Sequence, residues 1–181
     1  GLGGLGLAVA QWLVEKGARH LVLTSRHGLP SAGGAIADPQ DGQKEAAAVV
    51  AQLVAQGVQV TAAAIDVADA EAMRGLLSSL QPKVRGVLHL AGVMSDALVA
   101  QQDVALLDPV LRSKAVGAWV LHQITRDLSL DFFVLFSSVA AVLGPPGKGS
   151  YAAANAVLDA LAELRRAEGL PAVSLGFGPW T

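Results

Sequence analysis

Apolar positions along the chain follow two spacings, one helical and one extended. Segments 5–17 and 43–57 carry apolar residues at helical spacing, and each ends at a glycine that suits a helix C-cap, Gly17 and Gly57. A third helix is predicted from near Asp69 to about position 80, with acidic residues in its first turn. The predicted strands are, in chain order, "HLVLTS", "VQVTAAAID", "RGVLHLAGV", "LDFFVLFSS" and "AVSLGF".

Three further segments complete this pattern. Residues 26–42 are rich in Gly, Pro, Ser and Asp and predict an irregular loop. A long helical region is predicted over about 103–126, and a Gly/Pro loop and a helix beginning near Tyr151 follow the fourth strand. Because each strand stands about one helix from the next, the chain predicts an α/β fold with a Rossmann-like, doubly wound parallel sheet.

The ends of the chain lead to an expectation about completeness. We expect one domain over residues 1–181, truncated at both ends, because the chain opens inside a glycine loop that normally follows a strand. The absent parts are expected to be the first strand and a C-terminal lid region. Since that strand would form the middle of the sheet, the segment alone is expected to fold poorly and to be inactive.

Composition excludes several classes of function. Apolar residues make up 52% of the chain, charged residues 15%, and the net charge is -2, so nothing favours binding to nucleic acid or to an anionic membrane. No apolar run reaches the roughly 18 residues of a membrane span. The absence of cysteine removes disulfides, a thiolate nucleophile and a zinc-type cluster, and the four histidines do not suggest a metal site. A cytoplasmic enzyme without a metal fits these observations.

The opening "GLGGLG" fits the dinucleotide pattern G-x-G-x-x-G. Glycines there allow a tight turn and bring backbone N–H groups to a pyrophosphate at a helix N-terminus. A flexible N-terminal segment is the alternative, which the helix and strand that follow make less attractive. The cofactor-binding residues expected in this loop are Gly1, Leu2, Gly3, Gly4, Leu5 and Gly6.

Two later strand ends indicate the type of cofactor. After the first predicted strand stand Ser25 and Arg26 with no acidic residue, so Arg26 can pair with the 2′-phosphate of NADPH where an NAD enzyme usually has an acid. A solvated surface arginine is the alternative. Asp66 and Val67 lie where an adenine would rest, although Asp66 fits a helix cap or turn equally well.

The next two strand ends supply small and polar residues. Ala91 and Gly92 would let a cofactor lie against the strand end, and His89 is interpreted as a packed structural histidine. Ser138 ends the following strand, at the edge of the sheet that faces ligands. Tyr151, the only tyrosine, follows thirteen residues later, so the two hydroxyls could polarise and protonate one carbonyl.

A tyrosine that works at neutral pH needs a nearby cation, since free tyrosine has a pKa near ~10. The residue four positions on from Tyr151 is Asn155, which shares its helix face but carries no charge. No lysine follows Tyr151 in that helix.

Seven motifs together carry a resemblance: "GLGGLG", "TSR", "DV", "HLAGV", "FSSVA", "SYAAANA" and "GPW". The chain resembles, over essentially its whole length, the ketoreductase domain of a modular polyketide synthase, within the short-chain dehydrogenase/reductase superfamily. Most of that superfamily has lysine four residues after the tyrosine, whereas these ketoreductases exchange lysine and asparagine. The resemblance therefore implies that the cation is Lys114, in "SKAVGAW" on the preceding long helix.

The resemblance also implies a mechanism. NADPH would reduce the β-keto group of a 3-oxoacyl thioester; Tyr151 would protonate the alkoxide and Ser138 would hydrogen-bond the same oxygen. Lys114 would favour the ionised phenol and hold the nicotinamide ribose, and Asn155 would order a proton-relay water. Spacing to the tyrosine selects Ser138 over Ser137. The implied partners are an acyl carrier protein with its tethered substrate and the other domains of the same synthase.

Stereochemistry follows from two positions in the same resemblance. B-type enzymes carry a Leu-Asp-Asp stretch whose last Asp marks the class, and A-type enzymes carry a Trp a few residues before the tyrosine. This chain has Met94-Ser95-Asp96 and Leu143 at these places, which predicts B-type reduction to the D-3-hydroxyacyl product.

Two other functions remain as alternatives. A free-standing 3-oxoacyl carrier-protein reductase of fatty-acid synthesis keeps lysine four residues after tyrosine, where this chain has Asn155. A non-catalytic structural part of a synthase would lack both the cofactor loop and the four catalytic residues, here Lys114, Ser138, Tyr151 and Asn155.

Overall fold

The computed structural model describes residues 1–29 and 41–178. Most of the predicted loop over 26–42, and Pro179 and Trp180 of the "GPW" motif, lie outside the described residues. The chain forms two compact units, Gly1–Asp66 and Val67–Thr181, which are described separately below.

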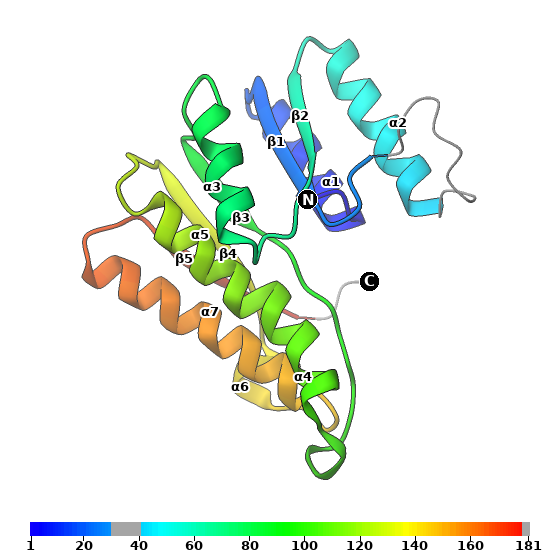
Figure 1. Ribbon diagram of the computed structural model, residues 1–181, viewed down its shortest axis with the longest axis vertical. Coiled ribbons are helices and arrows are strands. Elements are labelled where there is room, and N and C mark those ends of the chain that lie inside the picture. The colour runs from blue at the N-terminus through cyan, green and yellow to red at the C-terminus, as the bar shows by residue number, and fades with distance from the viewer. Residues whose placement is uncertain (30–40, 179–181) are drawn as a thin grey trace. The chain divides into compact units, whose positions relative to one another are not determined.

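The first unit contains two parallel strands and two helices (Figure 1). In register, His20 pairs with Gln59 and Ser25 with Ala64. Leucines, valines and alanines from both helices, from the first strand and from the turns beside these elements form its buried core, and Val60 of the second strand packs against it partly buried. The element bounds are α1 (Gly4–Glu15), β1 (His20–Ser25), α2 (Asp41–Ala55) and β2 (Gln59–Ala64).

Glycine ends both helices of this unit, as the sequence predicts. Gly17 follows α1 with a φ of 102°, and Gly57 follows α2 with a φ of 81°. Residues other than glycine rarely adopt such positive φ angles. These two glycines therefore allow the chain to turn from each helix into the next strand.

The second unit is built on a parallel ladder in the order β3-β4-β5. Its longest helix, α7, packs against β4 and β5 and also contacts α5 (Figure 1). Phe133 and Leu135 of β4 and Leu158 of α7 are fully buried in this layer. The bounds are α3 (Ala70–Ser79), β3 (Gly86–His89), η1 (Val99–Gln101), α4 (Val104–Leu111), η2 (Arg112–Val116), α5 (Gly117–Thr125), β4 (Phe132–Ser138), α6 (Ala140–Leu143), α7 (Gly149–Ala167) and β5 (Val173–Phe177).

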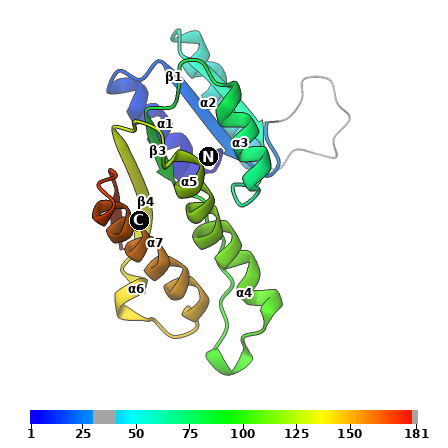
Figure 2. The ribbon, with the colours of Figure 1, turned by 60° about the vertical axis from the view of Figure 1, so that its left-hand side comes forward.

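The region predicted as one helix over 103–126 is helical throughout but not uniform. Asp103 caps its start by accepting a hydrogen bond from the N–H of Leu106 at 2.9 Å. Between α4 and α5, the segment η2 is a π-helical turn, in which the N–H of Gly117 reaches the carbonyl of Arg112 five residues back. Figure 2 shows α4 and α5 as one continuous helical segment. Such turns shift the direction of the side chains they carry, and this one carries Lys114.

The predicted α/β fold with parallel strands is confirmed, and all five strands lie where the sequence places them. Two details differ. Among the described residues the strands form two ladders, β1-β2 and β3-β4-β5. The predicted Gly/Pro loop after β4 begins with the short helix α6, which ends at Gly144 with a φ of 55°. The assignment of residues 1–181 to one domain stays a prediction.

Candidate functional site

The first two turns of α7 place Tyr151 and Asn155 one above the other. The alanine-rich sequence favours the helix, and residues four apart share a face. Asn155 is fully buried and its Nδ2 donates a hydrogen bond to the carbonyl of Tyr151 at 2.7 Å. Its other polar atom, Oδ1, has no hydrogen-bond partner among the described residues. The asparagine thus holds the tyrosine's backbone and offers a buried acceptor.

Lys114 brings an ammonium group from η2 to the same tyrosine. Its side chain is buried, with 5% of the residue exposed, and Nζ donates to the carbonyl of Phe136 at 2.7 Å. Nζ also lies 5.4 Å from the centroid of the Tyr151 ring, within the range of a cation–π contact. The structure therefore brings together a cation and the phenol ring from elements 37 residues apart, the separation of positions 114 and 151.

Burial changes the protonation of this lysine. Removal from water lowers the pKa of Lys114 to about 8, and the carboxylate of Asp159 opposes this change. The ammonium is therefore mostly charged at neutral pH, yet it loses its proton far more readily than an exposed lysine.

The two serines at the end of β4 point to different neighbours. Ser137 is buried and its Oγ donates to the carbonyl of Asn155 at 3.3 Å, which ties β4 to α7. Ser138 is half-buried, and its Oγ accepts a hydrogen bond from the N–H of Ala140 at 3.2 Å. Alternation along the strand thus gives Ser137 a structural contact and leaves Ser138 at the more accessible position.

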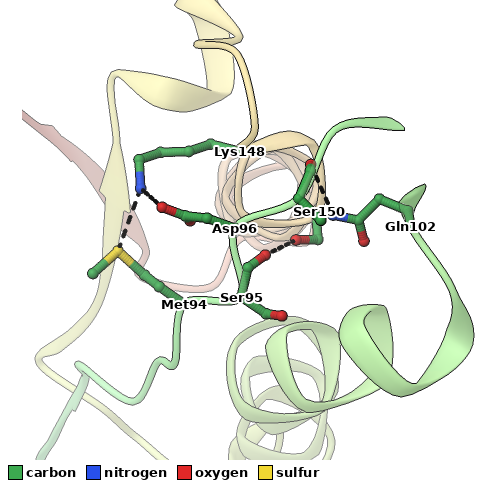
Figure 3. Close-up of polar contacts among 7 residues, drawn as sticks. Met94, Ser95, Asp96, Gln102, Lys148 and Ser150 are labelled. Atoms are coloured by element: carbon green, nitrogen blue, oxygen red, sulfur yellow. Dashed lines mark hydrogen bonds and ion pairs between the residues drawn. The ribbon is translucent and has the colours of Figure 1, made fainter. Parts of the chain in front are cut away.

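A clamp joins the segment 94–102 to the residues just before Tyr151 (Figure 3). Lys148 Nζ lies 2.6 Å from Asp96 Oδ2 and 4.0 Å from the sulfur of Met94. Ser150 Oγ donates to the carbonyl of Ser95 at 3.2 Å, and the two segments share a parallel bridge between Ala97 and Lys148. Both Lys148 and Asp96 are thereby held beside the first turn of α7. Leu143, the other predicted stereochemical position, is 74% exposed at the end of α6.

Small residues after β3 make room for the lysine. A Cβ on Gly92 would lie 3.0 Å from Cε of Lys114, so a side chain there would crowd the lysine stem. Ala91 beside it is half-buried. Val67 packs against the start of α5, where a Cβ on Gly117 would lie 2.5 Å from its Cγ1. Gly92 therefore leaves space for the side chain of Lys114, in addition to the cofactor contact predicted for Ala91 and Gly92.

The glycine loop of the first unit forms the tight turn that a pyrophosphate site needs. A Cβ on Gly6 would lie 2.3 Å from the carbonyl oxygen of Gly1, and one on Gly1 would lie 2.9 Å from the carbonyl of Thr24. The N-cap residue of α1, Gly3, supplies no side-chain hydrogen bond, and Gly3, Gly4 and Leu5 are exposed, whereas Leu2 and Gly6 are buried. The start of α1 is thus open to a phosphate group, which fits a dinucleotide.

The remaining predicted cofactor residues follow β1 and β2. Ser25 Oγ accepts a hydrogen bond from the N–H of Gly28 at 2.9 Å, which shapes the turn after β1. Arg26 in that turn is exposed, and Asp66 after β2 is half-buried. No group of three or more metal-ligating side chains gathers in the described parts of the chain. Among the described residues, no helix is long and apolar enough to cross a membrane.

His89 lies beside Lys114, and its hydrogen-bond partner could not be predicted from the sequence. The residue is 3% exposed, and its Nε2 lies 2.9 Å from the carbonyl oxygen of Lys114. The interpretation of His89 as a packed histidine holds as far as burial is concerned. The alternation of β3 could indicate its buried face, but no local signal links it to a residue on η2.

Comparison with known proteins gives one result throughout. The family model described as "KR domain" matches residues 1–181. Mycoketide-CoA synthase of Mycobacterium tuberculosis is 46% identical over 99% of this chain and 4% of its own length. Erythronolide synthase EryA2 of Saccharopolyspora erythraea is likewise 46% identical, over 99% of this chain and 5% of its own. The chain thus spans about a twentieth of these relatives.

Solved structures agree with these relatives. A structure described as A-type ketoreductases from a modular polyketide synthase is 48% identical, with a TM-score of 0.89, over 99% of this chain and 36% of that one. A short-chain dehydrogenase from Mycobacterium avium has a TM-score of 0.81 at 25% identity, over 98% of this chain and 64% of that one. The fold is therefore also found in a protein described as a short-chain dehydrogenase.

The lowered pKa of Lys114 predicts its reactivity in the full-length protein. Only the neutral amine reacts with formaldehyde and a reducing agent, so methylation of Lys114 should rise with pH with a midpoint at about 8. Peptide mass spectrometry over a pH series measures this. In Asp159→Asn, which removes the carboxylate that opposes the shift, the midpoint should fall further. A midpoint near the ordinary lysine value of 10.5 in both proteins would contradict the analysis.

Proposed function

The chain belongs to the ketoreductase (KR) domain family, and from that premise we propose that it uses NADPH to reduce the β-keto group of a polyketide 3-oxoacyl thioester. The substrate is carried by an acyl carrier protein, and the other domains of the same synthase supply and receive it. The observation that carries the proposal is the buried ammonium of Lys114, 5.4 Å from the ring of the only tyrosine.

The proposed chemistry needs two hydroxyl donors at the oxygen of the β-keto group and a cation beside the phenol that gives up its proton. When bound, NADPH supplies the hydride to the β-carbon. Tyr151 gives its hydroxyl proton to the oxygen of the forming alkoxide, and Ser138 donates a hydrogen bond to the same oxygen. Lys114 stabilises the negative charge that the departing proton leaves on the phenol, because a nearby cation favours an anion. The buried Oδ1 of Asn155 is the proposed acceptor for a proton-relay water.

The residues assigned to the cofactor divide by chemical task. The glycine turn before α1 holds the pyrophosphate through backbone N–H groups, and Arg26, exposed after β1, binds the 2′-phosphate. Lys114 also holds the nicotinamide ribose. The full set of proposed cofactor-binding residues is Gly1, Leu2, Gly3, Gly4, Leu5, Gly6, Ser25, Arg26, Asp66, Val67, Ala91, Gly92, Lys114 and Tyr151.

We propose B-type stereochemistry, which gives the D-3-hydroxyacyl product. Its support is Asp96, which Lys148 holds beside the first turn of α7 at 2.6 Å, together with Leu143 where A-type enzymes carry a tryptophan. Overall similarity favours the opposite outcome, because the solved structures that are 48% identical are described as A-type and A1-type. The product configuration decides between them.

Removal of the proton donor or the cation should strongly slow the reduction. In the full-length protein, Tyr151→Phe and Lys114→Ala should each lower kcat for a simple 3-oxoacyl thioester by about 10² to 10⁴, since general acid catalysis contributes that much. Oxidation of NADPH, followed at its nicotinamide absorbance, measures the rate. Lys83→Met, which removes an exposed lysine in a loop, is the matched control and should retain the wild-type rate. Unchanged rates in both site variants would remove the mechanism.

The role of Arg26 predicts a change in cofactor preference. The wild-type protein should prefer NADPH to NADH, and Arg26→Ala should reduce that preference roughly tenfold or more, since a hydrogen bond to a charged group contributes about 1.5–3 kcal/mol. Values of kcat/KM for both cofactors measure the preference. Arg19→Ala serves as the control, because Arg19 is exposed and bonds only to carbonyls of Val14 and Ala18 in the described part of the chain. A wild-type preference for NADH would contradict the assignment.

The clamp at Asp96 predicts the stereochemical outcome. Chiral analysis of the product should give the D-3-hydroxyacyl thioester, and Asp96→Ala should lower the selectivity. Lys148→Met should have a similar but smaller effect, at most about fivefold, because a partly exposed ion pair contributes no more than about 1 kcal/mol. An L-configured product from the wild-type protein would show A-type reduction and overturn the B-type assignment.

A further inference from the structure

His89 holds the main chain of Lys114. The histidine is the last residue of β3 and is buried, and its Nε2 lies 2.9 Å from the carbonyl oxygen of Lys114. A carbonyl only accepts hydrogen bonds, so Nε2 must carry the hydrogen and donate it. Burial lowers the pKa of His89 to about 4, so the ring is neutral at neutral pH and keeps this tautomer.

The turn that carries Lys114 depends on contacts from outside the helix. In η2 the N–H of Gly117 bonds to the carbonyl of Arg112, five residues back, and also to the carbonyl of Lys114, three residues back, in place of the usual α-helical spacing. Glycine at position 117 gives the ring of His89 room beside this turn, since a Cβ there would lie 3.2 Å from Cε1 of the histidine. The imidazole therefore packs against the turn as well as bonding to it.

The other end of the lysine is held by the neighbouring strand. His89 pairs with Leu135 in the β3–β4 ladder, and the carbonyl that receives the ammonium belongs to Phe136, the next residue of β4. The backbone of Lys114 is thus fixed by β3 and its Nζ by β4. Gly92, just past β3, leaves space for the methylene stem between these two anchors.

We infer that His89 is a positioning residue for Lys114, which it keeps at the distance from Tyr151 that the proposed reduction requires. This inference rests on the proposed function for its kinetic consequence, but the position of Lys114 can be measured without any activity. The hydrogen bond of His89 goes to the carbonyl of Lys114, so we infer that the histidine acts through the lysine.

The test compares His89→Leu, which loses the donor, with His89→Gln, whose side-chain amide can donate to the same carbonyl. In the full-length protein, His89→Leu should lower kcat about tenfold to a hundredfold, as expected for a misplaced catalytic group, with little change in KM. His89→Gln should restore most of the rate. His122→Leu is the matched control: His122 is also a buried histidine, it contacts Arg165, and its loss should lower the melting temperature without lowering kcat.

Methylation of Lys114, read by mass spectrometry, provides the measurement that is independent of activity. Its rate should increase in His89→Leu and remain at the wild-type value in His89→Gln and His122→Leu. If His89→Leu does not fold, His89→Met, which lacks a donor but adapts its shape, takes its place.

The outcomes separate the two proposals. Wild-type kcat and wild-type methylation in His89→Leu, while Tyr151→Phe is inactive, would overturn the inference and leave the proposed function intact. Absence of NADPH-dependent reduction in the wild-type protein would overturn the proposed function. In that case the methylation of Lys114 still decides whether His89 positions the lysine.

Discussion

A desolvated ammonium group is the constraint on which the second unit depends. An amine removed from water is stable in its charged form only if other groups replace the lost hydration. Around Lys114 the lost hydration is replaced by the carbonyl of Phe136 and the face of the Tyr151 ring. The carboxylate of Asp159 also favours the charged form of the amine. They compensate in part, since the pKa of Lys114 is still lowered to about 8. Lys114 is therefore mostly protonated at neutral pH, and its pKa depends on the groups that surround the amine.

The parallel ladder makes this arrangement possible. Pairing of β3 with β4 brings the last residue of β3 close to the carbonyl of Phe136, and pairing of β4 with β5 extends the surface on which α7 packs. Ser137 and Asn155 then tie β4 to α7 through a buried hydrogen bond. In a close-packed interior such contacts permit little displacement, so strand register determines the positions of the lysine and the tyrosine.

The segment 94–102, which lies beside the first turn of α7, is held by weaker interactions than Lys114 and Tyr151. The Lys148–Asp96 pair is partly exposed, and exposed pairs contribute little to stability, but it is supported by a parallel bridge and by the hydrogen bond from Ser150 (Figure 3). Together these contacts order the segment 94–102 against α7. Buried contacts thus hold the tyrosine and the lysine, whereas mostly surface contacts hold the segment proposed to control stereochemistry.

Local patterns in the sequence were enough to predict the elements and the chemical groups. Helical and alternating spacing, terminal glycines and the spacing from Ser138 to Tyr151 all act over a few residues, so they could be read directly. Contacts between distant segments could not be read from such patterns, and the pairing of Lys114 with Tyr151 was predicted only through the resemblance to a known family. The π-helical turn at Lys114, the bond from His89 to its carbonyl and the pairing of Lys148 with Asp96 join residues 25 to 52 positions apart or depend on such contacts. They arise only when the strands pair and the helices pack, because that step alone determines which buried polar groups meet.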